Sequence, residues 1–254
     1  MRQRPSLTPI VGTLPTTVPF VGPEAQERER GRPFRARIGA NESSFGPSPR
    51  VIARMESVAR DQWMYCDPDN FELKVAAAAH HKVGVENVVV GEGIDGLLGL
   101  VARMYVAPGD AVVTSLGAYP TFNFHIAGVG GRLVTVPYAN DKEDLDGLLA
   151  AVARERAPLV YLSNPDVARP NVVRMRTFSK AYGLAGIRCG YAVAEREVIR
   201  DFEKIRNHYG VSRMAQIAGL EALADQDYLN SVVARVAAGR RRIAAIAEEN
   251  GLKP

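Results

Sequence analysis

The chain carries a lysine-centred run, which reads Arg176-Thr177-Phe178-Ser179-Lys180-Ala181-Tyr182-Gly183-Leu184-Ala185-Gly186-Ile187-Arg188-Cys189-Gly190. The run begins at the end of segment 171–177, whose β-branched residues predict a strand. Since α/β folds bind ligands at the carboxyl ends of their strands, Lys180 stands where a ligand is expected. A lysine amine in a partly desolvated pocket forms a Schiff base with a carbonyl compound. The run is therefore a candidate site for a carbonyl ligand.

The same run also supplies groups that suit an anion. Thr177 and Ser179 carry hydroxyls, and the guanidinium of Arg188 fits a phosphate through two parallel hydrogen bonds. Gly183 and Gly186 are expected to let the backbone pass close to a ligand. These residue types equally suit a surface lysine in a glycine-rich loop, with Arg188 paired to an acid. Residue types alone leave both interpretations open.

Strand and helix signals alternate through the middle of the chain. Strands are expected at 87–90, 110–114, 132–136, 159–162 and 171–177, and helices at 48–62, 71–82, 94–105, 119–127 and 145–156. β-branched runs that alternate with helices favour a mainly parallel sheet covered on both faces. From about residue 195 to 250 the chain is expected to be almost wholly helical. The predicted fold class is α/β, a three-layer α/β/α arrangement with a mainly parallel sheet.

Residues 1–47 have a different character, rich in proline, glycine and arginine and without periodicity. Helices there are expected to be broken by a series of prolines, Pro5, Pro9, Pro15, Pro19 and Pro23. This segment is predicted to be an extended arm that lies against another part of the protein.

The bulk composition of the 254 residues, 46% hydrophobic and 24% charged, is that of an ordinary globular protein. The net charge of +4 is small, and the densest basic cluster, Arg240-Arg241-Arg242, is expected on a solvated helix face, so no nucleic acid is expected as a partner. Cys66 and Cys189 do not form a disulfide framework, and the sequence contains no metal-ligand spacing. The sequence contains no apolar run long enough for a membrane and no evident secretory signal, which makes the cytoplasm the default compartment.

Taken whole, the run from Ser179 to Tyr191 resembles the lysine motif of the fold-type I aminotransferases that use pyridoxal phosphate (PLP). It looks most like the histidinol-phosphate aminotransferase branch, and the similarity covers the chain from about residue 19 to its end. A string of this length is a specific signal. The resemblance implies the PLP-dependent transferase fold, PLP as cofactor, and Lys180 as the catalytic residue that binds it covalently. Thr177, Ser179 and Arg188 are then expected to hold the cofactor phosphate.

A second motif, Gly91-Glu92-Gly93-Ile94-Asp95-Gly96, lies between a predicted strand and a predicted helix. Backbone amides at a helix N-terminus bind phosphate because they are unsatisfied donors with the helix dipole behind them. Taken alone, the motif is better explained as a capped helix start with Asp95 as the cap. Its resemblance to the family's phosphate-binding loop gives Gly93, Ile94 and Asp95 the role of binding the cofactor phosphate.

Four further residues receive roles by resemblance alone. Tyr119, within the stretch 117–122, matches the aromatic residue whose face covers the cofactor ring. Tyr65 matches a tyrosine that reaches the phosphate of the neighbouring subunit, which implies a homodimer with shared active sites. Asn41 is expected to help hold the substrate carboxylate. Phe20 stands near the substrate where many relatives carry Tyr, so the polar contact of that hydroxyl is in question.

The family pattern is interrupted after Asp166. Relatives continue with an Asn, a helix and a strand that ends in the acid for the pyridine nitrogen, whereas Val167 and then Arg169 follow here. The predicted strands 159–162 and 171–177 are joined by only eight residues, and a parallel crossover needs about a dozen or more. Either these two strands are not parallel neighbours, or a connecting segment is absent. Asp166 itself is not expected to take the place of the missing acid.

The resemblance also sets the expected domains, with 1–47 as an N-terminal arm, 48–210 as the large PLP-binding domain, and 211–254 as the helical start of the small domain. An internal segment is expected to be missing near 166–168, and the small domain, with its substrate-carboxylate arginine, to be incomplete. Either the chain is a subset of a longer protein, or the protein itself is truncated. The intact flanking motifs favour the first explanation.

The reaction implied by the resemblance is transamination. An amino acid or an amino-alcohol phosphate of the histidinol-phosphate or aromatic type would pass its amino group to a 2-oxo acid such as 2-oxoglutarate, with Lys180 moving the proton. Decarboxylation of amino-acid phosphates by related enzymes uses similar motifs, so the sequence does not separate the two reactions. The lost ring-nitrogen acid keeps a third hypothesis open, a PLP-binding homologue without activity. A nucleic-acid binder rests only on the mild basic charge and ranks last.

Overall fold

The computed structural model describes the chain except residues 1–4, 17–19, 164–170 and 254. The chain divides into two compact units. The first comprises Met1–Arg37, Asp95–Arg174 and Arg200–Arg206, and the second comprises Ile38–Ile94, Met175–Ile199 and Asn207–Pro254. Each unit has its own three-stranded sheet, and the two are described in turn.

The first unit is built on a parallel sheet of order β3-β2-β4. The central strand β2 (Ala111–Ser115) pairs with β3 (Arg132–Val136) on one side and with β4 (Leu159–Tyr161) on the other. All five residues of β2 are buried, as expected for the apolar central strand of a parallel sheet. In this sheet the sequence predicts the strands to within one residue at most ends.

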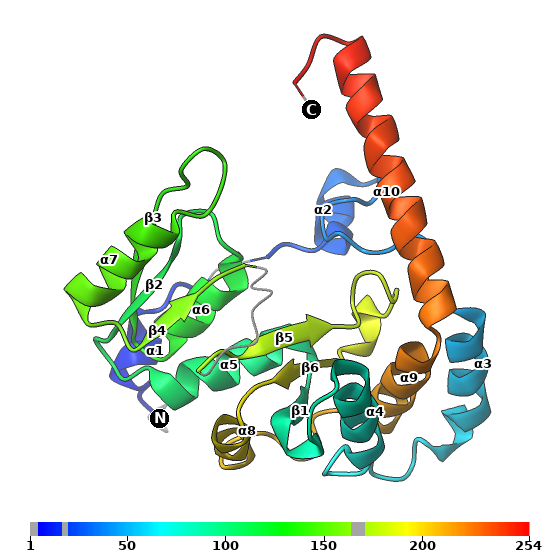
Figure 1. Ribbon diagram of the computed structural model, residues 1–254, viewed down its shortest axis with the longest axis horizontal. Coiled ribbons are helices and arrows are strands. Elements are labelled where there is room, and N and C mark those ends of the chain that lie inside the picture. Colours follow the sequence, from blue (N-terminus) through cyan, green and yellow to red (C-terminus); the bar gives the residue numbers. More distant parts are fainter. Residues whose placement is uncertain (1–4, 17–19, 164–170, 254) are drawn as a thin grey trace, which may run out of the picture. The chain divides into compact units, whose positions relative to one another are not determined.

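Helices of the first unit cover this sheet (Figure 1). Helix α7 (Leu145–Glu155) begins at Asp144, whose side chain accepts a hydrogen bond from the Gly147 amide at 2.9 Å, and it packs Leu148 and Ala151 against Val113. Helix α6 (Pro120–Gly128) starts with proline at a position where its missing N–H is not needed, and it packs against β3. The longer α5 (Gly93–Tyr105) belongs to this unit from Asp95 onward.

The second unit is built on a sheet of order β1-β6-β5. Strand β1 (Val88–Gly91) runs antiparallel to β6 (Gly190–Val193), with Val88 opposite Val193 and Gly91 opposite Gly190. Strand β5 (Arg174–Thr177) is bonded to the other edge of β6. This register places the end of β1, which leads into the Gly93 loop, beside the start of β6, which follows Arg188.

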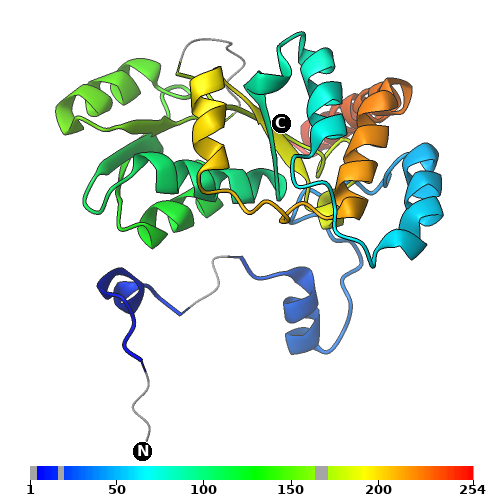
Figure 2. The same ribbon diagram turned by 90° about the horizontal axis from the view of Figure 1, so that it is seen from below.

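Helices make up most of the rest of the second unit, and the last of them extends away from its sheet (Figures 1 and 2). They are α3 (Pro49–Val58), α4 (Phe71–His81), the first half of α8 (Arg196–Glu203), α9 (Arg213–Ala224) and α10 (Gln226–Glu249), with short 3-10 turns η1 (Ala59–Asp61), η2 (Val85–Asn87) and η3 (Ala185–Ile187). Helices α3 and α4 pack against α9, and α4 also packs against β1. One buried cluster joins them, in which Leu73 and Ala218 meet Phe178 and Cys189 from the lysine run. The lysine run is therefore anchored in the core of this unit.

The α/β fold class with a parallel sheet is confirmed, and the strands are distributed over two sheets. Strands β4 and β5, which the short link joins, pair with β2 and β6 respectively, so they are not neighbours in the described sheets. The link itself, with Asp166 and Val167, lies outside the described residues. The second strand also starts later than predicted, at Arg174, and Asn171 has a φ of 63° that a strand does not use.

The prediction that prolines keep the N-terminal segment free of helix is wrong. The segment contains α1 (Pro9–Thr13) and α2 (Pro23–Arg30), and both helices begin at a proline. Proline is accommodated in the first helical turn because its fixed φ suits a helix and its N–H would be unpaired there anyway. Gly31, with a φ of 68°, ends α2.

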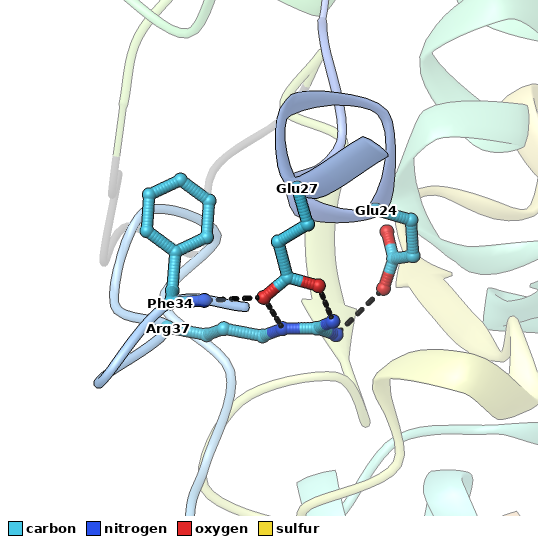
Figure 3. Close-up of polar contacts among 4 residues, drawn as sticks. All are labelled: Glu24, Glu27, Phe34 and Arg37. Carbon is cyan, nitrogen blue, oxygen red and sulfur yellow. Dashed lines mark hydrogen bonds and ion pairs between the residues drawn. The ribbon is translucent and has the colours of Figure 1, made fainter. Parts of the chain in front are cut away.

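Arg37 ties α2 to the segment that follows it (Figure 3). Its Nη1 donates to Glu24 at 2.7 Å, its Nε donates to Glu27 at 3.1 Å, and its Nη2 also donates to Glu27. Glu27 accepts the Phe34 amide at 2.8 Å as well. Arg37 lowers the pKa of Glu27 through these hydrogen bonds, with a further contribution from the Phe34 amide.

Candidate active site

The loop after β5 is shaped by short local hydrogen bonds. The Thr177 hydroxyl accepts the Ser179 amide at 3.0 Å, and the Gly183 amide donates to the Lys180 carbonyl at 2.9 Å. Phe178, which is fully buried, accepts the Leu184 amide at 3.0 Å through its carbonyl. These bonds close a compact turn that presents Lys180 from a fixed base.

Glycine is required at position 183 because the backbone of Gly46 and Pro47 lies too close for a side chain. Its φ is 69°, and a Cβ on it would lie 2.2 Å from the carbonyl carbon of Gly46 and 2.6 Å from the amide nitrogen of Pro47. We expected this glycine to make room for a ligand, and that interpretation is wrong: the neighbour is the end of the predicted arm, at Gly46 and Pro47. At Gly186 a Cβ would meet nothing within 4 Å.

The amine of Lys180 lies against the segment 39–43. Its Nζ donates to the Ala40 carbonyl at 2.8 Å, and the lysine is exposed in the single chain. The expected partly desolvated pocket is therefore not formed around Lys180 by the described chain alone. Asn41, the residue predicted to hold the substrate carboxylate, follows Ala40 directly, with a φ of 53° and an exposed side chain.

Arg188 follows the turn η3 and also has a left-handed backbone, with a φ of 57°. Its Nη1 donates to the Ala185 carbonyl at 3.0 Å. Within the described residues it has no carboxylate partner, so the alternative in which Arg188 merely pairs with an acid is not supported. Its Nη2 lies 2.6 Å from the place where a Cβ of Gly93 would stand.

Glycines keep the start of α5 open toward this arginine. Gly93 has a φ of 76°, and any side chain there would collide with the Arg188 guanidinium. A Cβ on Gly190 would lie 3.2 Å from the Ile94 amide nitrogen and would cover it. The arrangement combines a helix N-terminus, uncovered backbone amides and a guanidinium without a carboxylate partner, which together suit a phosphate group.

Cys189, between Arg188 and Gly190, anchors the lysine loop in the buried core. It is fully buried in the cluster with Phe178 and Leu73. Burial raises the pKa of its thiol to about 12. This residue is therefore a packing group, and Arg188 projects from a rigid base.

Besides Tyr65, six of the predicted cofactor residues belong to the second unit, and they are Gly93, Ile94, Thr177, Ser179, Lys180 and Arg188. Tyr65 belongs to the same unit, is 81% exposed, and packs its ring against Tyr209 at 5.0 Å between centroids. The Arg213 Nη2 donates to the Tyr65 carbonyl at 2.5 Å.

Tyr119 and Phe20 belong to the other unit, and both are exposed. Tyr119 precedes α6, and nearby Tyr161 stacks on Phe122 with 4.4 Å between ring centroids. Burial raises the pKa of the Tyr161 hydroxyl. The roles of Tyr119 and Phe20 remain predictions.

The sequence analysis missed a contact of Asp95. We considered Asp95 as the cap of α5, but its carboxylate accepts a hydrogen bond from His125 Nε2 on α6 at 3.0 Å. Among the described residues there is no group of three or more His, Cys, Asp or Glu side chains that could hold a metal ion. In the same part of the chain no helix has the length and apolarity needed to span a bilayer.

A family model for class I and II aminotransferases matches residues 37–167 and 165–254. The chain belongs to this family. The two matched stretches of this aminotransferase meet at 165–167, next to the interruption seen in the sequence.

Curated relatives of this aminotransferase carry the name histidinol-phosphate aminotransferase. The protein from Roseiflexus castenholzii is 31% identical, with 94% of this chain and 77% of the relative covered. The protein from Moorella thermoacetica is 30% identical, with 81% of this chain and 66% of the relative covered. The chain thus spans about two thirds to three quarters of the length of these relatives.

A solved structure of histidinol-phosphate aminotransferase from Sinorhizobium meliloti, in complex with pyridoxal-5'-phosphate, superposes with a TM-score of 0.94. It is 48% identical to this chain and is matched over 100% of this chain and 80% of its own. This similarity, together with the family, makes the protein a PLP-dependent aminotransferase.

The residues of this chain fit the cofactor. The start of α5, where Gly93 and Gly190 carry no side chain and Arg188 lies close by, suits a phosphate, and Lys180 on the same loop as Arg188 carries an amine. Arg188 is available for an anion because the described chain gives it a carbonyl and no carboxylate as a partner.

Proposed function

We propose that this aminotransferase transfers the amino group of histidinol phosphate, or of a closely related amino-alcohol phosphate or aromatic amino acid, to a 2-oxo acid such as 2-oxoglutarate. The proposal is supported by the relatives named above, and most strongly by the 48% identity to the Sinorhizobium meliloti enzyme. The structural observation that carries it is the placement of Lys180, Arg188 and the open start of α5 within one compact unit. A place in histidine biosynthesis follows from this substrate.

Lys180 is proposed to be the catalytic residue. Bound PLP withdraws electrons from the bond that breaks at the amino-bearing carbon of the substrate. The Nζ of Lys180 would take the proton from that carbon and deliver it to the carbon of the cofactor that carries the transferred nitrogen. Its Nζ donates a hydrogen bond to the carbonyl of Ala40, the residue that precedes Asn41.

The phosphate of the cofactor is proposed to lie between Arg188 and the start of α5. Arg188 contributes charge, the amides of Gly93, Ile94 and Asp95 contribute donors, and the hydroxyls of Thr177 and Ser179 complete the set. Ser179 is only 8% exposed, so it is largely shielded from bulk water. Tyr119 is proposed to cover the ring.

Asn41 and Phe20 are proposed to lie near the substrate. Asn41 is adjacent to the residue that Lys180 contacts, which supports a position close to the reacting carbon. Phe20 offers an apolar face without a hydroxyl. This chemistry favours an aromatic or imidazole side of the substrate over a charged one.

The function is tested by spectroscopy on the purified protein. PLP-loaded protein is expected to absorb in the visible range, and borohydride is expected to fix the cofactor on Lys180, as read by peptide mass. Histidinol phosphate without a 2-oxo acid is expected to bleach this band, and 2-oxoglutarate to restore it.

Each alternative gives a different result in that experiment. Carbon dioxide release from an amino-acid phosphate, without need for a 2-oxo acid, identifies a decarboxylase. A stable band that no amino donor bleaches identifies an inactive PLP-binding protein. Retention of the borohydride-fixed cofactor by Lys180→Ala would show that Lys180 is not the residue that binds it.

A homodimer with shared active sites is proposed from the exposure of Tyr65. Trp63, two residues earlier in the sequence, is also exposed, and the Tyr209 ring packs beside Tyr65 on the same unit. Large exposed aromatic side chains are typical of a protein interface. In this proposal a second copy of the chain covers this surface, and Tyr65 reaches the phosphate in that copy.

Mixed dimers test this arrangement. In this proposal each active site takes Lys180 from one copy and Tyr65 from the other. A dimer of one Lys180→Ala chain and one Tyr65→Phe chain therefore has one site with both residues intact, and co-refolded mixtures are expected to recover activity. Light scattering is expected to give twice the mass of one chain. A monomer, or a mixture without recovery, would remove the shared-site proposal.

We also propose that residues 48–210 form the cofactor-binding domain, with 1–47 as an arm and 211–254 as the start of the small domain, and that a segment found in relatives is missing near 166–168. The alignment with the Roseiflexus relative extends over 286 residues although this chain has 254, so the relative carries residues that this chain lacks. The intact mass of the natural protein tests this directly. Cytoplasmic location is part of the same proposal and is tested by cell fractionation.

A further inference from the structure

We propose that His125 is a positioning residue that holds the Asp95 carboxylate away from the amides at the start of α5, so that these amides stay free for the cofactor phosphate. The proposal rests on the cofactor site described under the proposed function. It adds a residue, His125, to which the family resemblance gave no role.

The protein's own carboxylate at Asp95 lies at a helix end that we propose to bind a phosphate. Asp95 is the third residue of α5, which begins at Gly93. A carboxylate in the first turn of a helix is attracted to the unpaired amides and to the positive end of the dipole. Unrestrained, the Asp95 carboxylate would therefore compete with a phosphate for the same donors, and would repel the phosphate charge.

The structure shows the Asp95 carboxylate engaged elsewhere. Its Oδ1 accepts a hydrogen bond from His125 Nε2 at 3.0 Å, and among the described residues this is its hydrogen-bond partner. The Asp95 side chain is 44% exposed and the His125 side chain 22% exposed, so the histidine is the better fixed of the two. His125 comes from a different helix, α6, so the Asp95 carboxylate is bonded to a side chain outside α5.

Gly99 makes this contact possible. It lies one turn after Asp95 on α5, on the same helix face. A Cβ on Gly99 would lie 3.0 Å from both Cε1 and Nδ1 of the His125 ring. The ring thus lies directly against the glycine, and a methyl group there would push it by a few tenths of an ångström. The close fit indicates that the histidine occupies a defined position beside α5.

The energetic scale follows from the charge that is moved. A charge near a helix end changes the free energy by about 0.3 to 1 kcal/mol at exposed sites, and the upper figure corresponds to about fivefold in a dissociation constant. The dissociation constant of PLP, measured by fluorescence titration of the apoprotein in phosphate-free buffer, is therefore expected to rise about fivefold in His125→Phe.

The path through Asp95 is tested by a double-mutant cycle. In Asp95→Ala the amide remains and the competing carboxylate is gone, so adding His125→Phe to this background is expected to leave the PLP dissociation constant within about twofold. His125→Gln keeps an N–H donor for Asp95 and is expected to bind PLP like the wild type. A structural role for the histidine would instead give the same loss in both backgrounds.

Gly99→Ala separates binding from stability. Alanine in a helix interior is favoured over glycine, so this variant is expected to unfold at the same temperature as the wild type or higher, yet to bind PLP more weakly. Gly128→Ala is the matched control, since a Cβ on Gly128 meets nothing within 4 Å. It is expected to bind PLP like the wild type.

The outcomes distinguish this inference from the proposed function. Wild-type protein that binds no PLP would overturn both. Wild-type protein that binds PLP while His125→Phe binds it equally well would overturn the role of His125 alone. An equal loss from His125→Phe with and without the Asp95 carboxylate would overturn it too.

Discussion

Two arginines in this chain make opposite use of the same side chain. Arg37, after the helix α2, is held by the carboxylates of Glu24 and Glu27 (Figure 3). Arg188, in the lysine loop, is held by the Ala185 carbonyl, and the described chain offers it no carboxylate. Arg37 is surrounded by its own counter-charges, and Arg188 keeps a guanidinium that is positioned and still needs an anion.

The difference shows how a binding arginine is recognised beside a structural one. A carbonyl can fix the direction of a guanidinium without neutralising it, whereas a carboxylate does both. The surrounding backbone follows the same distinction. The lysine loop is tied to the buried cluster through Phe178 and Cys189, and the segment around α2 has no buried residue in the helix itself. The region that we propose to bind the cofactor is anchored in the buried cluster, and the region around α2 is held by its own charges.

The largest expected effect comes from the two left-handed glycines of these regions. Gly183 and Gly31 have φ of 69° and 68°, but a Cβ on Gly183 would strike the backbone of Gly46 and Pro47, while one on Gly31 meets nothing within 4 Å. Gly183→Ala is expected to lower the free energy of unfolding by about 3 kcal/mol or more, since strain and a backbone clash add. Gly31→Ala carries the strain alone, about 1 kcal/mol.

Urea unfolding followed by circular dichroism measures both variants. Similar free energies of unfolding for Gly183→Ala and Gly31→Ala would show that the lysine loop accommodates an added Cβ as easily as the segment around α2 does. The contrast between a rigid and an exposed region would then be lost.

The next effect is on the cofactor. Arg188→Ala is expected to raise the PLP dissociation constant about a hundredfold, because a hydrogen bond to a charged group contributes about 1.5 to 3 kcal/mol. Arg37→Ala, an arginine of equal size removed from the other region, is expected to leave the PLP dissociation constant unchanged. Arg188→Lys keeps the charge without the two-pronged geometry and is expected to fall between.

Spectroscopic titration of the apoprotein with PLP measures all three. A hundredfold loss in Arg37→Ala, or none in Arg188→Ala, would reverse the assignment of the two arginines. The melting temperatures of the apoproteins serve as the control for folding.

The sequence predicted the sheet elements well because their signals are local. The apolar run of β2 and the capping aspartate before α7 each encode a boundary in a few residues. The N-terminal segment was predicted wrongly because proline has two effects, and only its position in a helix decides between them. Pro9 and Pro23 stand at helix starts, which no count of prolines reveals.

In the site, the residue types were predictable and the contacts were not. The run around Lys180 identifies the amine and the arginine, but the contact of Gly183 with Gly46 joins residues far apart in sequence. The Asp95 contact with His125 is of the same kind, since it depends on the packing of α6 beside α5. An aspartate three residues into a helix signals a cap, and only the structure shows a histidine competing for it.

A smaller effect is expected at the glycine that faces Arg188. A Cβ on Gly93 would lie 2.6 Å from Nη2 of Arg188, and an alanine there would have to adopt the φ of 76° that Gly93 has. Gly93→Ala is therefore expected to displace the guanidinium and raise the PLP dissociation constant about tenfold. Gly186→Ala adds the same methyl group to the same loop in open space, and its affinity is expected to match the wild type. Equal affinities for these two variants would show that the Arg188 position is not set by Gly93.

The smallest effect is expected at Glu27, the carboxylate that pairs with Arg37. Arg37 and the Phe34 amide lower the pKa of Glu27 from its ordinary value of 4.5. A lowered pKa means that the contribution of Glu27 to local stability is present above pH 4.5 and is lost as the pH falls through the folded-state value. Hydrogen-exchange protection of the Phe34 amide is therefore expected at pH 6, and it is expected to be lost as the pH falls below 4.5 and through the folded-state pKa of Glu27. In Arg37→Ala the main cause of the shift is gone, so the loss is expected to begin at a higher pH, nearer 4.5. The same midpoint in both proteins would mean that Arg37 does not hold this carboxylate, and the structural half of the comparison would fail.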